Sequence, residues 1–271
     1  MKQLLTFLTF CVVSASASAL DFVIPYSTGG STSLVLQNIL PAIKAVGVDA
    51  DVRYVGNCRM AQAQLTGKPQ LYFWSNDLEC ATPTIDPTSF VALFYWTPLY
   101  LCGRQDNLSA YKTGNVKLAV NVGPLHSQLG GAIRAAMSTD MRVISYANTG
   151  AIKTSLVTNE VDLVLTTIGP ALVAEGLAKC YAASTNNNLA GLVTLKSITG
   201  DVANSVYFAT GWISAQGMAP ADLKNIQNAV QEQMRTAAYR DLIVGKMKRE
   251  LPDATVEQQI HRVTQSLQLN K

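Results

Sequence analysis

The stretch Val23–Gln37 reads VIPYSTGGSTSLVLQ and contains an apolar run, a glycine turn and a second apolar run at helical spacing. This order predicts a strand, a loop and the first turns of a helix. The free backbone N–H groups at a helix start, with the positive end of the helix dipole behind them, favour a bound anion. The paired glycines Gly29 and Gly30 let a ligand approach the backbone closely, because they carry no Cβ atom. We therefore expect this loop to bind a small anion.

The N-terminal segment has the pattern of a secretory signal peptide. Lys2 precedes an apolar run over residues 4–13, and small residues at positions 17–19 form a cleavage site. The apolar run is too short to span a bilayer. We expect a signal peptide over residues 1–19, cleavage after Ala19 and a mature chain in the periplasm. An ordinary N-terminal helix of a cytosolic protein is the alternative.

The composition indicates a globular protein that does not bind nucleic acid. Hydrophobic residues make up 48% of the chain, charged residues make up 14%, and the formal net charge is +3. No basic stripe interleaved with aromatic residues occurs, so a nucleic-acid partner is not expected. No apolar run after the signal peptide is long enough to span a membrane. A mature chain of about 250 residues allows one large domain or two smaller ones.

The predicted mature chain holds four cysteines, an even number that suggests two disulfides in an exported protein. Three pairings are possible, and we favour Cys58–Cys80, which are close in sequence, and Cys102–Cys180, which lie on two expected strands. Reduced, buried cysteines are the alternative. The chain has no Cys-x-x-Cys motif and only two histidines, so we expect neither a metal site nor a cofactor.

Strand-like and helix-like segments alternate along the mature chain. Expected strands cover residues 23–25, 52–55, 71–74, 90–96, 99–102, 116–120, 142–145, 163–166, 180–183, 192–195 and 206–210. Expected helices cover residues 32–46, 60–65, 127–137, 150–158, 171–178, 221–238 and 256–267. Repeated strand–helix units predict an α/β fold with mostly parallel sheets and helices on both faces.

The strand, glycine loop and helix pattern occurs at residues 23–37 and again at residues 116–137. Two such halves predict two lobes that face each other across a cleft and close around a ligand. The alternative is that Gly123 and the pair Gly130–Gly131 serve only packing and turns. We assign residues 20–102 to the first lobe, 103–210 to the second lobe and 211–271 to a return to the first lobe with C-terminal helices.

Three motifs follow one another along the chain in a recognisable order. The first is the Pro-aromatic-x-x-Gly-Gly loop Pro25-Tyr26-Ser27-Thr28-Gly29-Gly30. In the second, Ser145-Tyr146 leads through GAIKTSLV to Asn159-Glu160-Val161-Asp162. The third combines a strand containing Gly211-Trp212-Ile213 with a helix begun by Ala219-Pro220-Ala221. Over nearly the whole mature chain, these motifs resemble the extracytoplasmic solute receptors of tripartite tricarboxylate transporters, the Bug-type receptors.

The chain departs from that family's pattern at three points. Ser33 stands where the family has Asp after the glycine loop, and a serine can cap the helix but brings no charge. Ala147 and Asn148 stand where the family has Lys and Gly. The segment Gly56-Asn57-Cys58-Arg59 replaces a glycine-rich segment. The resemblance is therefore that of a distant member, whose ligand need not be one of the family's usual carboxylates.

The resemblance implies a two-lobed type 2 periplasmic-binding-protein fold that clamps a small carboxylate with backbone amides and hydroxyls. It implies a monomeric receptor that delivers this ligand to membrane transporter subunits and catalyses no reaction. The expected ligand-binding residues are Tyr26, Ser27, Thr28, Gly29, Gly30, Ser31 and Thr32 in the first lobe, and Gly123, His126, Ser127, Gln128, Tyr146, Thr166 and Thr167 in the second. A solvated loop position for His126 and a core position for Tyr146 are the alternatives. Arg53 and Arg59 are expected at the surface, where either could meet a second carboxylate.

Other functions share these sequence features. The ligand-binding subunit of a sensor and the receptor of an ABC-type importer would have the same fold and the same motifs. A secreted hydrolase is a third alternative, because His126 and Ser127 are adjacent. The chain lacks the Gly-x-Ser-x-Gly nucleophile elbow, however, and neighbours in sequence rarely form a nucleophile–base pair.

Overall fold

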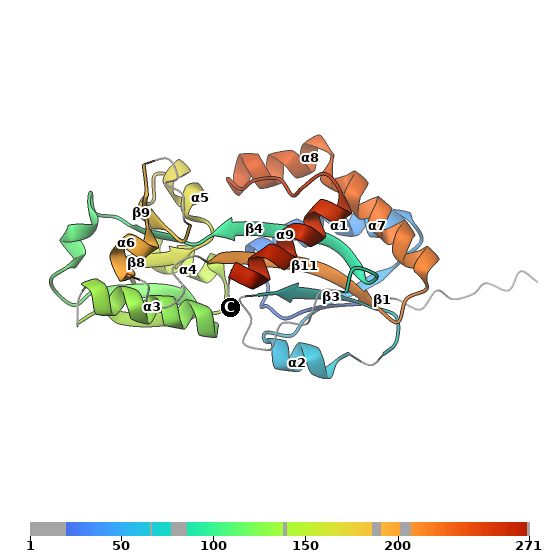
Figure 1. Ribbon diagram of the computed structural model, residues 1–271, viewed down its shortest axis with the longest axis horizontal. Helices are drawn as coiled ribbons and strands as arrows, with labels where there is room; N and C mark the ends of the chain where they lie inside the picture. The colour runs from blue at the N-terminus through green and yellow to red at the C-terminus, as the bar shows by residue number, and fades with distance from the viewer. Residues whose placement is uncertain are drawn as a thin grey trace, which may run out of the picture.

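The computed structural model describes residues 20–65, 67–76, 86–137, 140–185, 191–200 and 207–269. The predicted signal peptide lies outside these described residues. Two β-sheets with their own helices lie side by side along the longest axis of the molecule (Figure 1). We call the five-stranded sheet with its helices the first lobe and the six-stranded sheet with its helices the second lobe.

The first lobe has the strand order β2-β1-β3-β11-β4. Its strands are β1 (Leu20–Ile24), β2 (Ala50–Tyr54), β3 (Gln70–Ser75), β4 (Phe90–Pro98) and β11 (Phe208–Gln216). β1 pairs in parallel with β2 and β3, whereas β11 runs antiparallel to β3 and β4. The apolar residues of each strand face alternate sides of the sheet, so both faces bury a layer of helices.

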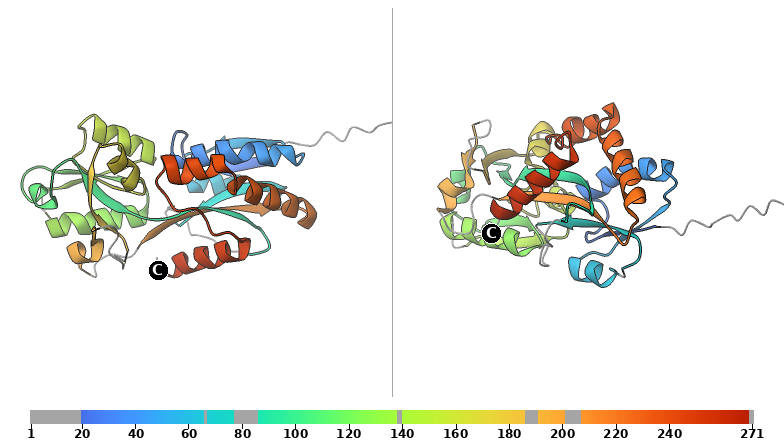
Figure 2. Two further views of the ribbon diagram at one scale, coloured as in Figure 1. Left: turned by 90° about the horizontal axis from the view of Figure 1, so that it is seen from above. Right: turned by 45° about the vertical axis from the view of Figure 1, so that its right-hand side comes forward.

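Phe22 and Ile24 of β1 face one layer and Val23 faces the other. The first layer comprises α1 (Ser31–Ala45), α7 (Pro220–Met234), α8 (Ala237–Arg240) and the π-helix η2 (Asp241–Lys246). The second layer comprises α2 (Cys58–Ala63) and the terminal helix α9 (Val256–Leu269). Figure 2 shows α9 in red across the sheet from α1 and α7.

The second lobe has the strand order β10-β9-β5-β8-β6-β7. Its strands are β5 (Tyr100–Gly103), β6 (Lys117–Asn121), β7 (Arg142–Tyr146), β8 (Leu163–Thr166), β9 (Lys179–Ala183) and β10 (Val193–Thr194). β5 runs antiparallel to β8 and β9, and the other pairs are parallel. Helices α3 (Pro124–Met137) and α6 (Leu195–Thr199) cover one face, and α4 (Thr149–Val157) and α5 (Gly169–Ala174) cover the other. A 3-10 helix, η1 (Leu108–Tyr111), follows β5.

The chain changes sheets between β4 and β5 and returns through β11. The second lobe therefore begins at β5, before the predicted boundary at residue 103, and the first lobe resumes at Phe208, before the predicted residue 211. Trp96 of β4 and Phe208 of β11 stack with ring centroids 4.1 Å apart. The guanidinium of Arg262 on α9 lies over the Trp96 ring at 4.6 Å and also binds Asp253. These contacts hold the two crossing strands together where they leave the first lobe.

Most of the predicted strands and helices occur within a few residues of their expected bounds. The prediction of a strand over residues 192–195 is wrong at its end, because the Thr194 hydroxyl caps α6 by accepting a hydrogen bond from the Ser197 N–H. The expected helix over residues 221–238 is divided, because the Thr236 hydroxyl caps a new helix, α8, in the same way. No helix in the described ranges is both long and apolar enough to cross a membrane.

The disulfide predicted between Cys102 and Cys180 is present and joins the neighbouring strands β5 and β9. Cys58 is also disulfide-bonded. Its predicted partner, Cys80, lies outside the described residues, so the pairing Cys58–Cys80 stays a prediction.

Removing the Cys102–Cys180 bridge is expected to destabilise the second lobe. The bridge closes a loop with a sequence separation of 78 residues, and a disulfide restricts the unfolded chain. The double variant Cys102→Ala/Cys180→Ala should lose about 2–4 kcal/mol of the free energy of unfolding. Urea unfolding without reductant, with the wild-type protein as reference, measures this loss. An unchanged unfolding free energy would contradict the expectation.

Candidate functional site

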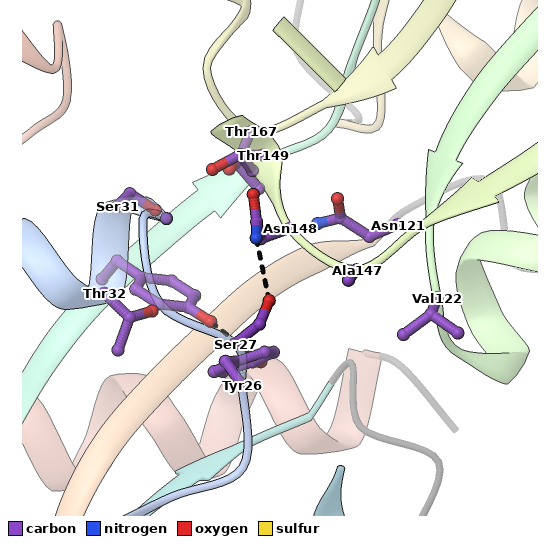
Figure 3. Close-up of a pocket in the computed structure, with 12 residues that line it drawn as sticks. Tyr26, Ser27, Ser31, Thr32, Asn121, Val122, Ala147, Asn148, Thr149 and Thr167 are labelled. Carbon is purple, nitrogen blue, oxygen red and sulfur yellow. Dashed lines mark hydrogen bonds between the residues drawn. The ribbon is translucent and has the colours of Figure 1, made fainter. Parts of the chain in front are cut away.

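A pocket lies between the two lobes, and Figure 3 shows the side chains that surround it. The first lobe contributes the loop before α1, the start of α1 and one residue of β4. The second lobe contributes the last residue of β6 and the segments that follow β6, β7 and β8. The lining residues are Tyr26, Ser27, Gly30, Ser31, Thr32, Tyr95, Asn121, Val122, Ala147, Asn148, Thr149 and Thr167. None of these side chains carries a charge at neutral pH.

The pocket lies beyond the carboxyl ends of parallel strands in both lobes. β1 ends at Ile24, directly before the Tyr26 loop, and β6 ends at Asn121. β7 ends at Tyr146 and β8 at Thr166, each one residue before a residue of the pocket lining. This is where ligands bind in open α/β sheets.

Two helices begin at the pocket from opposite lobes. α1 begins at Ser31 after Gly30, which offers no side-chain cap, and α4 begins at Thr149 after Asn148. Neither helix has an acidic residue in its first turn. Because the first N–H groups of a helix lack intrahelical partners and lie at the positive end of its dipole, the two helix starts together favour a bound anion.

Asn148 holds the two helix starts together. Its Oδ1 accepts a hydrogen bond from the Ala151 N–H at 2.9 Å and so caps α4. Its Nδ2 donates to the Ser27 Oγ of the first lobe at 2.9 Å (Figure 3). The same nitrogen donates to the Thr28 carbonyl at 3.3 Å. One side chain therefore orders a helix start in its own lobe and binds the glycine loop of the other lobe.

Two glycines permit this close approach of the lobes. A Cβ atom on Gly30 would lie 3.3 Å from the Asn148 Cβ, and one on Gly150 would lie 2.8 Å from the Gly29 carbonyl oxygen. The second distance is too short for a real contact, and a backbone oxygen cannot move aside as a flexible side chain can. Gly150 thus lets the start of α4 rest against the loop of the first lobe.

Aromatic hydroxyls form another wall of the pocket. The Tyr95 hydroxyl lies 3.2 Å from the Ser75 Oγ and 3.4 Å from the Tyr26 hydroxyl. The Tyr26 ring meets Phe73 edge to face at 5.7 Å between centroids. These contacts fix Tyr26 and Tyr95 on the first-lobe core, where both residues line the pocket.

The pocket is narrow and adjoins a wider groove. The pocket has a cavity volume of about 30 Å³, whereas one water molecule needs roughly 10–15 Å³ of such space. The groove has a volume of about 730 Å³ and shares Tyr26, Val122 and Ala147 with the pocket. Arg59 on α2 and Tyr146 at the end of β7 also line it. Burial raises the pKa of the Tyr146 phenol above its usual value.

The structure brings part of the predicted site together. The predicted residues that line the pocket are Tyr26, Ser27, Gly30, Ser31, Thr32 and Thr167. Thr28 and Gly29 belong to the same loop without lining the pocket. Tyr146 lines the adjoining groove.

The other predicted residues of the second lobe lie elsewhere. Thr166 is fully buried, and its hydroxyl accepts a hydrogen bond from the Ile168 N–H. Gly123, Ser127 and Gln128 line neither the pocket nor the groove. His126 is fully buried, 5.7 Å from the Tyr207 ring, rather than a solvated loop residue.

The burial of His126 also bears on the hydrolase hypothesis. Ser127 is exposed on α3 whereas His126 is fully buried, so the two side chains lie on different faces of that helix. A general base must reach the nucleophile that it activates. Within the described ranges, no group of three or more His, Cys, Asp or Glu side chains is arranged to hold a metal ion.

Half of the lining residues were not predicted from the sequence. These residues are Tyr95, Asn121, Val122, Ala147, Asn148 and Thr149. The five other than Tyr95 lie within three residues of the ends of the expected strands at 116–120 and 142–145 or begin the next helix. The rule that sites lie beyond the carboxyl ends of parallel strands could have found them. Tyr95 lies within β4 and gives no such signal.

Comparison with known proteins identifies the fold. Neither a protein-family model nor a curated protein sequence matches the chain. The solved structure of MatC from Rhodopseudomonas palustris with bound malate matches with a TM-score of 0.68 at 17% identity, over 93% of this chain and 99% of MatC. The periplasmic binding protein BugD matches with a TM-score of 0.69 at 17% identity, over 93% and 95% of the two chains. Rpa4515 from R. palustris with adipate matches with a TM-score of 0.63 at 15% identity, over 93% and 97%.

These likenesses extend over both lobes, since they cover nearly all of each chain. They confirm the fold predicted from the sequence motifs. The chain has the two-lobed α/β fold of type 2 periplasmic binding proteins.

Proposed function

We propose that this protein is a periplasmic solute-binding receptor of the Bug type, which captures a small carboxylate between its lobes and delivers it to a membrane transporter. One observation carries the proposal: the N-termini of α1 and α4 converge from opposite lobes on a single uncharged pocket. In a pocket between two helix N-termini, hydroxyl, amide and backbone N–H groups can donate hydrogen bonds to both oxygens of a carboxylate. No lysine or arginine in the lining is then needed. The proposal includes a monomeric receptor exported by its signal peptide.

The narrow pocket supports capture by lobe movement. A cavity of about 30 Å³ holds little more than water molecules, so a carboxylate reaches this site only when the lobes separate. The crossing segments around Leu99 and Phe208 are the points where the lobes can hinge. The groove beside Arg59 would receive the part of a ligand that extends beyond the first carboxylate.

Ligand binding is tested with a panel of acids on the mature protein. The panel contains malate, adipate, citrate, amino acids and aromatic acids, with adipamide as the neutral counterpart of adipate. At least one acid should raise the melting temperature, because a ligand at 100 times its Kd adds about 2.7 kcal/mol of stability. Adipamide should give no shift. If no acid shifts the melting temperature and native mass spectrometry finds no co-purified acid, the proposal is wrong.

The variant Gly150→Ala tests whether closure requires contact between the two helix starts. Its added Cβ would meet the Gly29 carbonyl at 2.8 Å, so the lobes could not close fully and the affinity for the acid should fall about tenfold or more. Gly131→Ala on α3 is the matched control, because a Cβ there meets nothing within 4 Å. Alanine is favoured over glycine in a helix by up to about 1 kcal/mol, so the control should be stable and bind normally. Equal affinity of both variants, measured by titration calorimetry, would contradict the closure geometry.

A further inference from the structure

A buried cation lies directly behind the pocket. Arg249 belongs to the segment between η2 and α9 and is only 8% exposed. Its Nη2 donates to the Thr167 Oγ1 at 2.7 Å and approaches the Ser31 Oγ at 3.4 Å. Its guanidinium carbon lies 5.3 Å from the centroid of the Tyr95 ring. Ser31, Tyr95 and Thr167 all line the pocket, whereas Arg249 itself does not.

The arrangement directs two hydroxyl protons away from Arg249. A serine or threonine hydroxyl has one proton to donate and can accept through its lone pairs. Because Arg249 donates to the Thr167 oxygen, the Thr167 proton remains available to another acceptor, and the same holds for Ser31. A hydroxyl that accepts a hydrogen bond from a cation also becomes a stronger donor. Both hydroxyls are therefore suited to bind a carboxylate in the pocket.

The Arg249–Thr167 hydrogen bond also connects the lobes. Met247, two positions before Arg249, is part of the first-lobe core, whereas Thr167 follows β8 in the second lobe. In this bond the donor belongs to the first lobe and the acceptor to the second. In the bond from Asn148 to Ser27 the donor belongs to the second lobe and the acceptor to the first. Separation of the lobes would remove the guanidinium from Thr167. The full set of donors is therefore assembled only when the pocket is closed.

We propose that Arg249 is a positioning residue that gives the pocket its preference for anions. It acts through Ser31 and Thr167, orients their hydroxyl protons toward the ligand, and supplies from behind the lining the positive charge that the lining lacks. The inference rests on the proposed function, because it names the determinant of carboxylate selectivity at the same site. It predicts that charge recognition and lobe closure depend on one side chain.

The test compares Arg249→Met, Arg249→Lys and the matched control Arg240→Met, which removes an exposed charge from the same lobe. Malate, adipate and citrate are the probes, with adipamide as the neutral control, and titration calorimetry measures each affinity. Hydrogen bonds to charged groups contribute about 1.5–3 kcal/mol, so Arg249→Met should weaken acid binding about 10- to 100-fold. Arg249→Lys should restore part of this loss, and Arg240→Met should bind as the wild type does.

A double variant separates positioning from a purely structural role. Thr167→Val removes the oxygen that accepts from Arg249, so the affinity losses of Arg249→Met and Thr167→Val should overlap rather than multiply in the combined variant. Wild-type affinity in Arg249→Met, an equal loss in Arg249→Lys, or multiplying losses would overturn the inference. If Arg249→Met does not fold, the single variants Arg249→Lys and Thr167→Val test the inference. Each should lose part of the wild-type affinity for the acid. Failure of the wild type to bind any acid would instead overturn the proposed function.

Discussion

Two helices, α1 and α4, begin against each other across the cleft, and the arrangement of the site depends on that contact. It requires glycine at position 150, where a Cβ atom would meet the Gly29 carbonyl of the opposite lobe at 2.8 Å. It also requires Asn148, which caps α4 and binds the Ser27 hydroxyl. Each helix start alone is a weak anion site on a protein surface. Together, and shielded from water between two lobes, their dipoles and free N–H groups act on one small volume, where a lower dielectric strengthens every polar interaction.

The way the chain connects the two sheets allows the contact between the two helix starts to open and close. The sheets are joined through β4 and β5 and through β11, so the lobes are tied together at one edge of the cleft. Trp96, Phe208 and Arg262 stiffen the crossing strands near the first lobe. In the part of the chain that the structure describes, the hydrogen bonds across the cleft include those from Asn148 to Ser27 and Thr28 and the one from Arg249 to Thr167. A few hydrogen bonds between the lobes can break and reform, whereas the apolar cores of the lobes cannot.

Much of this architecture could be predicted from the sequence because it depends on local patterns. The glycine loop before α1 and the alternation of strands and helices are visible in short windows, and the pairing of Cys102 with Cys180 follows from their places on two expected strands. Arg249 and Tyr95 could not be found in this way. Arg249 reaches Ser31 through a contact that spans most of the chain, and Tyr95 occupies the middle of a strand whose neighbours are apolar. His126 illustrates the opposite error, since its position after a glycine turn predicts a site residue, whereas the packing of α3 buries it beside Tyr207.

The central claim is that one carboxylate is held between two helix N-termini, and a crystal structure of the mature protein with the tightest-binding acid tests it most directly. We expect a carboxylate with its oxygens within about 2.7–3.2 Å of backbone N–H groups at the start of α1, around Ser31 and Thr32, and at the start of α4, around Thr149. We also expect a hydrogen bond from the Thr167 hydroxyl. A carboxylate bound only beside Arg59 in the groove, with both helix starts unoccupied, would contradict the account.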